Sequence, residues 1–172
     1  MGTTGTPLGG HAADHETERR AIVREAVTMG LYIAVSLLSV LLTVPATESR
    51  AAAIGLVWGS TVGFTLAHWL AFQLSARIYA GAHLERHDRV ALSAQGVAAA
   101  IVAAIATVPL ALADGGSGLG LARIAVALVL GLVAYGAATR HGAGRGRALV
   151  YAGLAMAVAV GVAVLKNVLT GH

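Results

Sequence analysis

The chain has 172 residues, which corresponds to one folding unit, and 57% of them are apolar while only 12% are charged. Since an ordinary soluble domain has about 25% charged residues, this composition excludes a soluble globular protein and indicates an integral membrane protein. The 12 basic and 8 acidic residues lie in short clusters between apolar runs, so the net charge of +4 does not indicate a nucleic-acid partner. The absence of cysteine excludes disulfides, thiolate metal sites and cysteine nucleophiles.

Five apolar runs are long enough to cross a bilayer core of about 30 Å as helices. They cover residues 26–46, 54–76, 91–112, 120–138 and 148–168. The fourth run contains Arg123 close to a glycine-rich connector, so we expect this side chain to lie at the first helical turn and extend outward. The predicted fold is an all-α, polytopic integral membrane bundle of five transmembrane helices. It occupies residues 21–172 and follows a flexible, polar N-terminal tail formed by residues 1–20.

The positions of the cationic residues predict how the chain is threaded, because cationic residues in short loops are retained on the cytoplasmic side. Nine fall on the side of the N-terminus: Arg19, Arg20, Arg24, Arg77, Arg86, Arg89, Arg140, Arg145 and Arg147. Three fall on the other side: Arg50, Arg123 and Lys166. The split predicts a cytoplasmic N-terminus and an external C-terminus. A composition rich in Ala, Gly and Arg, with a single lysine, suggests a GC-rich bacterial genome and hence the bacterial inner membrane.

The second run has a stripe of small residues at every fourth position: Gly55, Gly59, Gly63, Ala67 and Ala71. This GxxxG spacing lets a neighbouring backbone approach closely in a membrane. The fifth run has a shorter version, formed by Gly153, Ala157 and Gly161. We expect these glycines to lie in helix contacts, within the subunit or between subunits, although the same spacing also arises by chance in a chain so rich in Ala and Gly.

Polar side chains form a second pattern, on the opposite face of the second run and on one face of the first. When the two runs pair as an antiparallel hairpin, residues at equal depth have numbers that sum to about 100, and the two polar faces match. The candidate pathway-lining residues are Tyr32, Ser36, Ser39, Thr61, Thr65 and His68. Such a ladder predicts either a hydrated path or interhelical hydrogen bonds. Alternatively, each hydroxyl bonds back to a carbonyl of its own helix.

His68 is the only His, Asp, Glu, Lys or Arg well inside any predicted span. An ionisable residue at such depth is a functional hypothesis by default, and an imidazole can relay protons or sense pH near neutrality. The alternative is a neutral histidine that is hydrogen-bonded to Tyr32 or to a backbone carbonyl. One imidazole with no cysteine and no carboxylate nearby in sequence does not make a metal site, so we expect neither a metal nor a cofactor.

Motifs for catalysis are missing from the sequence. It contains no HExxH, GxSxG or GxxxxGK[ST], and no paired carboxylates inside a span, so we expect no enzymatic activity. The favoured hypothesis is an oligomeric ion or proton channel lined by the polar residues of the first two spans. The alternative is a non-transporting accessory or scaffold subunit that docks onto another membrane protein through the glycine stripe. The expected partners are the lipid bilayer and either further copies of the chain or a different membrane protein.

Overall fold

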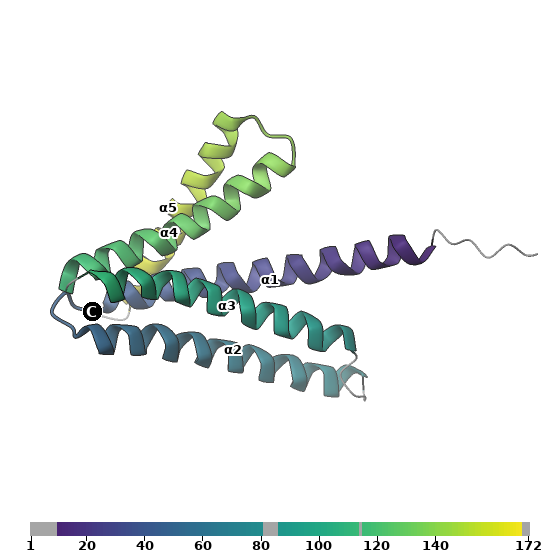
Figure 1. Cartoon of the computed structure of the whole chain (residues 1–172), viewed down its shortest axis with the longest axis horizontal. Coiled ribbons are helices and arrows are strands. Elements are labelled where there is room, and N and C mark those ends of the chain that lie inside the picture. The colour runs from purple at the N-terminus through teal and green to yellow at the C-terminus, as the bar shows by residue number, and fades with distance from the viewer. Residues whose placement is uncertain (1–9, 81–85, 114, 170–172) are drawn as a thin grey trace, which may run out of the picture.

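The computed structural model of the chain describes residues 10–80, 86–113 and 115–169. These residues form five helices in an up-and-down order and no strand (Figure 1). The helices are α1 (Gly10–Thr43), α2 (Arg50–Ala80), α3 (Arg86–Leu112), α4 (Gly115–Arg140) and α5 (Arg145–Leu169). Each contains a stretch that is long and apolar enough to cross a membrane. The prediction of an all-α chain with five candidate membrane spans is therefore confirmed.

The helix ends follow from local sequence. Ser49 precedes α2, and its hydroxyl oxygen accepts a hydrogen bond from the amide of Ala52 at 3.2 Å, as an N-cap residue does. After α4 the chain turns at Gly142, whose φ of 79° lies in the left-handed region that favours glycine. The amide of Ala143 donates to the carbonyl of Ala138, and the amide of Gly142 donates to that of Thr139, which is the Schellman ending.

The helix α1 starts earlier than the sequence indicated. It begins at Gly10, so the second half of the predicted tail is part of a helix, while residues 1–9 lie outside the described part of the chain. The guanidinium of Arg20 donates to the carboxylate of Glu16 at 3.0 Å, one turn away, and pairs at this spacing support a solvated helix. At 1.5 Å per residue, the 34 residues of α1 extend about 50 Å, which exceeds the thickness of a bilayer core.

The core of the molecule is built around α1, which packs against each of the other four helices. Ile33, Leu37 and Leu41 of α1 are fully buried, together with Val57 of α2 and Val126 of α4. In the most apolar stretch of α1, 44% of the residues are buried, whereas the corresponding share is 17% in α2 and in α5. The helices α2 and α5 therefore lie at the outside of the bundle and expose most of their apolar side chains.

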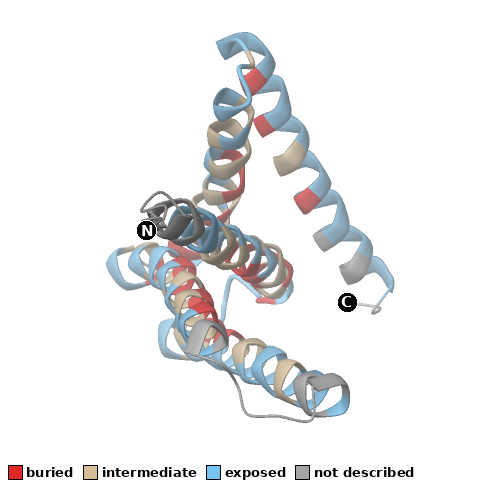
Figure 2. Cartoon of the chain, turned by 90° about the vertical axis from the view of Figure 1, so that its right-hand side faces the viewer, coloured by how far each residue is buried: buried red, intermediate tan, exposed pale blue. Residues whose placement is uncertain are grey.

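The hairpin of α4 and α5 diverges from the other three helices. The hairpin begins near the α1–α2 and α3–α4 turns, and its far end rises away from α1 (Figure 1). Buried residues gather where the helices cross, and α5, which leads to the C-terminus, carries few of them (Figure 2). Between α1 and this hairpin lies a groove of about 980 Å³.

Four described glycines allow close contacts between segments, and a Cβ on the first of them, Gly116, would lie 3.4 Å from that of Ala46. A Cβ atom on Gly30 of α1 would lie 3.6 Å from the Cβ of Ala98 in α3. A Cβ on Gly131 of α4 would lie 2.9 Å from the sulfur of Met156 in α5, and one on Gly118 would lie 2.9 Å from the carbonyl oxygen of Ala113. The close contacts of the described chain thus use glycines outside the stripes predicted from GxxxG spacing.

The expectation that Arg123 extends outward is wrong. Its side chain is half-buried and turns toward α1, where it donates to the carbonyl of Leu41 at 3.0 Å (Nε) and 2.8 Å (Nη2) and to that of Val44 at 3.2 Å (Nη2). The last carbonyls of a helix have no intrahelical partner and carry partial negative charge. Arg123 goes to these acceptors because they lie within its reach and favour a cation.

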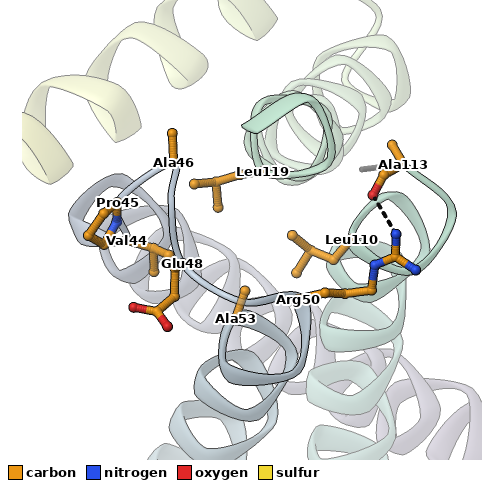
Figure 3. A pocket seen from close by; sticks show the side chains of 9 residues that line it. All are labelled: Val44, Pro45, Ala46, Glu48, Arg50, Ala53, Leu110, Ala113 and Leu119. Atoms are coloured by element: carbon orange, nitrogen blue, oxygen red, sulfur yellow. Dashed lines mark hydrogen bonds between the residues drawn. The ribbon is translucent and has the colours of Figure 1, made fainter. Parts of the chain in front are cut away.

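A second arginine at the same end of the molecule behaves similarly. The Nη2 atom of Arg50 donates to the carbonyl of Ala113, just after α3, at 3.4 Å (Figure 3). The small pocket beside it, between the α1–α2 turn, Leu110 and Leu119, has a volume of about 20 Å³. That volume admits about one water molecule, so the pocket is too small for a larger ligand. Two of the three cationic residues predicted to be external therefore cap helix C-termini.

Candidate functional site

The two most buried of the predicted pathway residues, Ser39 and Thr61, do not line a path. Ser39 is 5% exposed and Thr61 is 4% exposed. The hydroxyl of Ser39 donates to the carbonyl of Val35 at 3.0 Å, and that of Thr61 donates to Val57 at 2.7 Å. Both hydroxyls are thus satisfied within their own helices, which is the alternative that the sequence left open.

An aromatic contact lies between α1 and α2 at a level where the sequence predicted matching polar side chains. The ring of Tyr32 meets that of Phe64 edge to face, with centroids 5.9 Å apart and an interplanar angle of 78°. Tyr32 is 52% exposed, whereas Ser36 is half-buried one turn further along α1. Tyr32 meets Phe64, which lies one turn of α2 before His68, the residue predicted at its level, so α1 and α2 pair antiparallel with a shift from the predicted register. This contact fills their interface at this depth with apolar rings instead of polar groups.

Thr65 and His68 lie in a different setting, a cleft of about 600 Å³ between α2 and α3. The cleft lies in the half of the bundle where α1 and α3 begin and α2 ends. We call it the α2–α3 cleft, and it is lined by Met29, Thr65, Leu66, His68, Trp69, Gln73, Arg89, Leu92, Ser93 and Gln95. Six of these ten side chains are polar or charged, in a chain that is 57% apolar. Five of these six lie inside predicted spans and Arg89 lies just before one, although most of the surface of the cleft is apolar.

The α2–α3 cleft combines a fixed positive charge with a titratable imidazole. Arg89 and His68 are both exposed to it, and none of its described lining residues is a carboxylate. The hydroxyls of Thr65 and Ser93 donate to carbonyls of their own helices, Thr61 at 2.7 Å and Val90 at 2.8 Å. Their oxygens keep lone pairs that can accept hydrogen bonds. The cleft therefore offers donors to an anion and both donors and acceptors to water or protons.

Gln95 forms the buried end of this cleft. Its side chain is 7% exposed, and its Nε2 atom donates to the Glu25 carboxylate of α1 at 3.3 Å. Its Oε1 atom is buried and has no hydrogen-bond partner among the described residues. An unpaired buried polar group costs about 1–3 kcal/mol, while the hydrogen bond that the same side chain donates to the Glu25 carboxylate stabilises the contact of α3 with α1.

The glycine stripes face away from the rest of the chain. Gly55, Gly59 and Gly63 are exposed, and no described atom would lie within 4 Å of a Cβ added to any of them. The same holds for Gly153 and Gly161 of α5. These glycines therefore make no helix contact within the described chain, and a contact between subunits stays a prediction.

Sequence reasoning missed four polar residues of the cleft, besides its apolar lining. Arg89 was used only to orient the chain, and Gln73, Ser93 and Gln95 were not singled out. A signal was available, because the chain contains just two glutamines and both lie inside predicted spans, near the ends that the alternating topology brings together. The contact between Gln95 and Glu25 joins residues 70 positions apart, and no local pattern encodes it.

The fold defines the class of the protein, an all-α chain whose five described helices are long and apolar enough to span a membrane, and the cleft between α2 and α3 has a mostly apolar surface that includes a few polar side chains. No known protein family, curated protein or solved structure matches the chain. Among the described residues, no three His, Asp or Glu side chains gather closely enough to hold a metal ion.

Proposed function

We propose that the chain is a subunit of an oligomeric ion or proton pathway, in which the α2–α3 cleft is the entrance. The observation that carries this proposal is the gathering of Thr65, His68, Gln73, Arg89, Ser93 and Gln95 in one cleft of about 600 Å³. Polar residues within membrane spans are expensive and mark substrate and ion pathways. The unpaired oxygen of Gln95 adds to this argument, because it stands ready to accept a hydrogen bond from water or a permeating species.

The proposal includes an oligomer because a single chain does not enclose a continuous path across the membrane. Beyond Thr65 the contact of α1 and α2 is filled by the Tyr32–Phe64 pair and then by the buried side chains of Leu37 and Val57. A continuous path needs a further wall that faces Thr65 and His68, since the glycine face of α2 points the other way. Further copies of the chain would provide that wall.

The fixed positive charge of Arg89 favours a small anion over any cation, a proton included, so a proton route rests on His68 alone. Arg89 contributes a permanent positive charge, and the carboxylate of Glu25 accepts a hydrogen bond from Gln95. Cationic side chains line anion pores, whereas acidic side chains line cation pores. A proton route would use the imidazole of His68 as a relay. We therefore expect flux driven by an H⁺ or Cl⁻ gradient and none driven by a K⁺ gradient.

Flux into proteoliposomes under separate H⁺, K⁺ and Cl⁻ gradients tests the proposal. Arg89→Gln should lower the flux, and His68→Ala should change its pH dependence while leaving the melting temperature unchanged, since the side chain is exposed. Arg140→Gln is the matched control, because Arg140 is an exposed cation at the same end of the molecule and does not line the cleft. Wild-type protein that is folded yet gives no flux above empty liposomes would refute the pathway.

One observation favours the second candidate, an accessory or scaffold subunit. The face of α2 that carries Gly55, Gly59 and Gly63 is open along its whole length, as a docking surface for another membrane helix would be. This candidate predicts no flux for the purified protein under any gradient. It also predicts that the variants Arg89→Gln and His68→Ala behave like the wild type.

A further inference from the structure

A second cavity lies on the opposite side of α1 from the α2–α3 cleft. It is a groove of about 980 Å³ between α1 and the diverging hairpin of α4 and α5. Along most of its length the walls are aliphatic, with Val27 and Leu31 from α1, Leu130 and Ala134 from α4, and Leu154 and Val158 from α5. We call it the α4–α5 groove. Its walls offer no hydrogen bonds to a polar ligand and suit a hydrocarbon chain.

The mouth of this groove is polar. At the turn that joins α4 to α5, the lining changes to His141, Gly142, Arg147 and Tyr151. Arg147 and Tyr151 are four residues apart on α5, so they lie one above the other on the same face of the helix. Both are exposed, as is His141. Guanidinium, phenol and imidazole groups are donors that bind phosphate oxygens.

The charge around the mouth has one sign. None of the eight acidic residues of the chain lies beyond Asp114, so the whole α4–α5 hairpin carries cationic groups without a carboxylate. Arg140 and Arg145 flank the same turn. The part of α1 that lines the groove contributes Val27, Leu31 and Val35, which are uncharged. The mouth is thus complementary to an anion, and no described carboxylate in the lining competes for it.

We infer that the α4–α5 groove binds an anionic phospholipid, with its phosphate at Arg147 and an acyl chain along α5. The groove runs from Arg147 to Val162, which is about 22 Å at 1.5 Å per residue. One leaflet contributes about 15 Å of the hydrocarbon core and a headgroup layer above it. The groove therefore covers one leaflet, and Arg147 lies at headgroup depth when Val162 lies near the bilayer centre.

Native mass spectrometry of the purified full-length chain tests this inference. Phosphatidylglycerol and phosphatidylcholine with identical acyl chains are titrated separately, and inorganic phosphate is added as a competitor. We expect phosphatidylglycerol to bind about fivefold more tightly than phosphatidylcholine, because one interfacial arginine adds about that factor for an anionic lipid. Phosphate at millimolar concentration should not displace the lipid, since it lacks the acyl chain.

Three variants locate the site. Arg147→Gln should reduce the affinity for phosphatidylglycerol to that for phosphatidylcholine. Arg145→Gln, which removes an equal charge two residues away and outside the groove, should leave the preference intact. Ala155→Phe, which fills the aliphatic part, should weaken the binding of both lipids, and circular dichroism should show unchanged helix content.

The inference is overturned by any of four results. These are equal affinity for the two lipids, equal losses from Arg145→Gln and Arg147→Gln, wild-type binding by the folded Ala155→Phe variant, and displacement of the lipid by phosphate alone. The first two would assign the effect to general surface charge. The third would place the acyl chain elsewhere, and the fourth would leave a phosphate site without a lipid.

Discussion

Arg123 caps a helix to which it does not belong. Its guanidinium makes three hydrogen bonds to the carbonyls of Leu41 and Val44 at the end of α1. A hydrogen bond from a charged group contributes about 1.5–3 kcal/mol, and a cation at a helix C-terminus gains further from the helix dipole. The half-buried setting of the side chain preserves part of this effect from screening by solvent.

We therefore expect Arg123→Gln to lower the free energy of unfolding by about 1–3 kcal/mol. Thermal unfolding in detergent, followed by circular dichroism, measures the change. Arg140→Gln is the control, because Arg140 is exposed at the end of its own helix and should shift the melting temperature little. Equal melting temperatures for the two variants would show that the cap does not stabilise the protein.

Gly118 and Gly120 make a matched pair for a prediction about the start of α4. A Cβ on Gly118 would lie 2.9 Å from the carbonyl oxygen of Ala113 and 3.1 Å from that of Pro109, whereas a Cβ on Gly120 would meet no described atom within 4 Å. Gly118→Ala should therefore destabilise the protein by about 1–3 kcal/mol, because the backbone of the α3–α4 turn must shift. Gly120→Ala should stabilise it by about 0.5–1 kcal/mol through helix propensity.

The same unfolding assay tests this prediction through the sign of the change in melting temperature of each variant. The two alanine variants should melt on opposite sides of the wild type. A Gly118→Ala variant that melts at or above the wild-type temperature would mean that the α3–α4 turn is looser than the structure describes.

At the scale of the helix, α2 leaves most of its apolar stretch exposed, because the other helices of the chain cover little of it. If its glycine face docks onto another helix, Gly59→Leu and Gly63→Leu should each reduce the size of the assembly in detergent, because the side chains force the backbones apart. The fold of the single chain should persist, since no described atom lies within 4 Å of a Cβ at either position. Gly136→Leu, at a position of α4 that is equally open but outside the stripe, is the control.

Light scattering or analytical ultracentrifugation of the detergent complexes reads out this prediction. A wild-type protein that is already monomeric, or leucine variants that keep the wild-type size, would place the stripe against lipid. The helix content of all three variants should match that of the wild type.

The existence of the five helices could be predicted because it depends on a local property, the length of each apolar run. Which faces pack together could not, because that depends on how the helices cross. Gly55, Gly59 and Gly63 have the spacing of a contact and face outward, while Gly30, Gly118 and Gly131 lack a stripe and meet their neighbours closely. In a chain with 22 glycines, spacing alone does not separate the two groups.

The candidate site was predictable in part for a similar reason. Thr65 and His68 stand out because they are polar within an apolar run, and this contrast is visible in the sequence. Whether a hydroxyl faces a cleft or its own backbone is decided by the neighbouring helix, so Ser39 and Thr61 were grouped with Thr65 although they are buried. Arg89 joins the cleft because α3 returns beside α2, which is a consequence of the topology.

For the whole molecule, the alternation of the helices places the starts of α1 and α3, the end of α2 and the α4–α5 turn at one end. This end carries nine of the 12 cationic residues, so we expect it to face the cytoplasm. A reporter that is active only outside the cytoplasm should be active when fused after His172 and inactive when fused in the α4–α5 turn at Gly144. The reverse pattern, with both fusions well expressed, would show that the chain is inserted the other way round.

The cap on α1 also bears on the order in which the chain is made. Leu41 and Arg123 are 82 positions apart, and at 5–20 residues per second the ribosome needs about 4–16 s to add that length. During this interval α1 has already been synthesised while its last carbonyls lack their arginine partner, so water or the insertion machinery must satisfy them. The first helix to be made is therefore completed only when the fourth one is inserted, and a chain cut short after α3 would leave the central helix of the bundle unfinished.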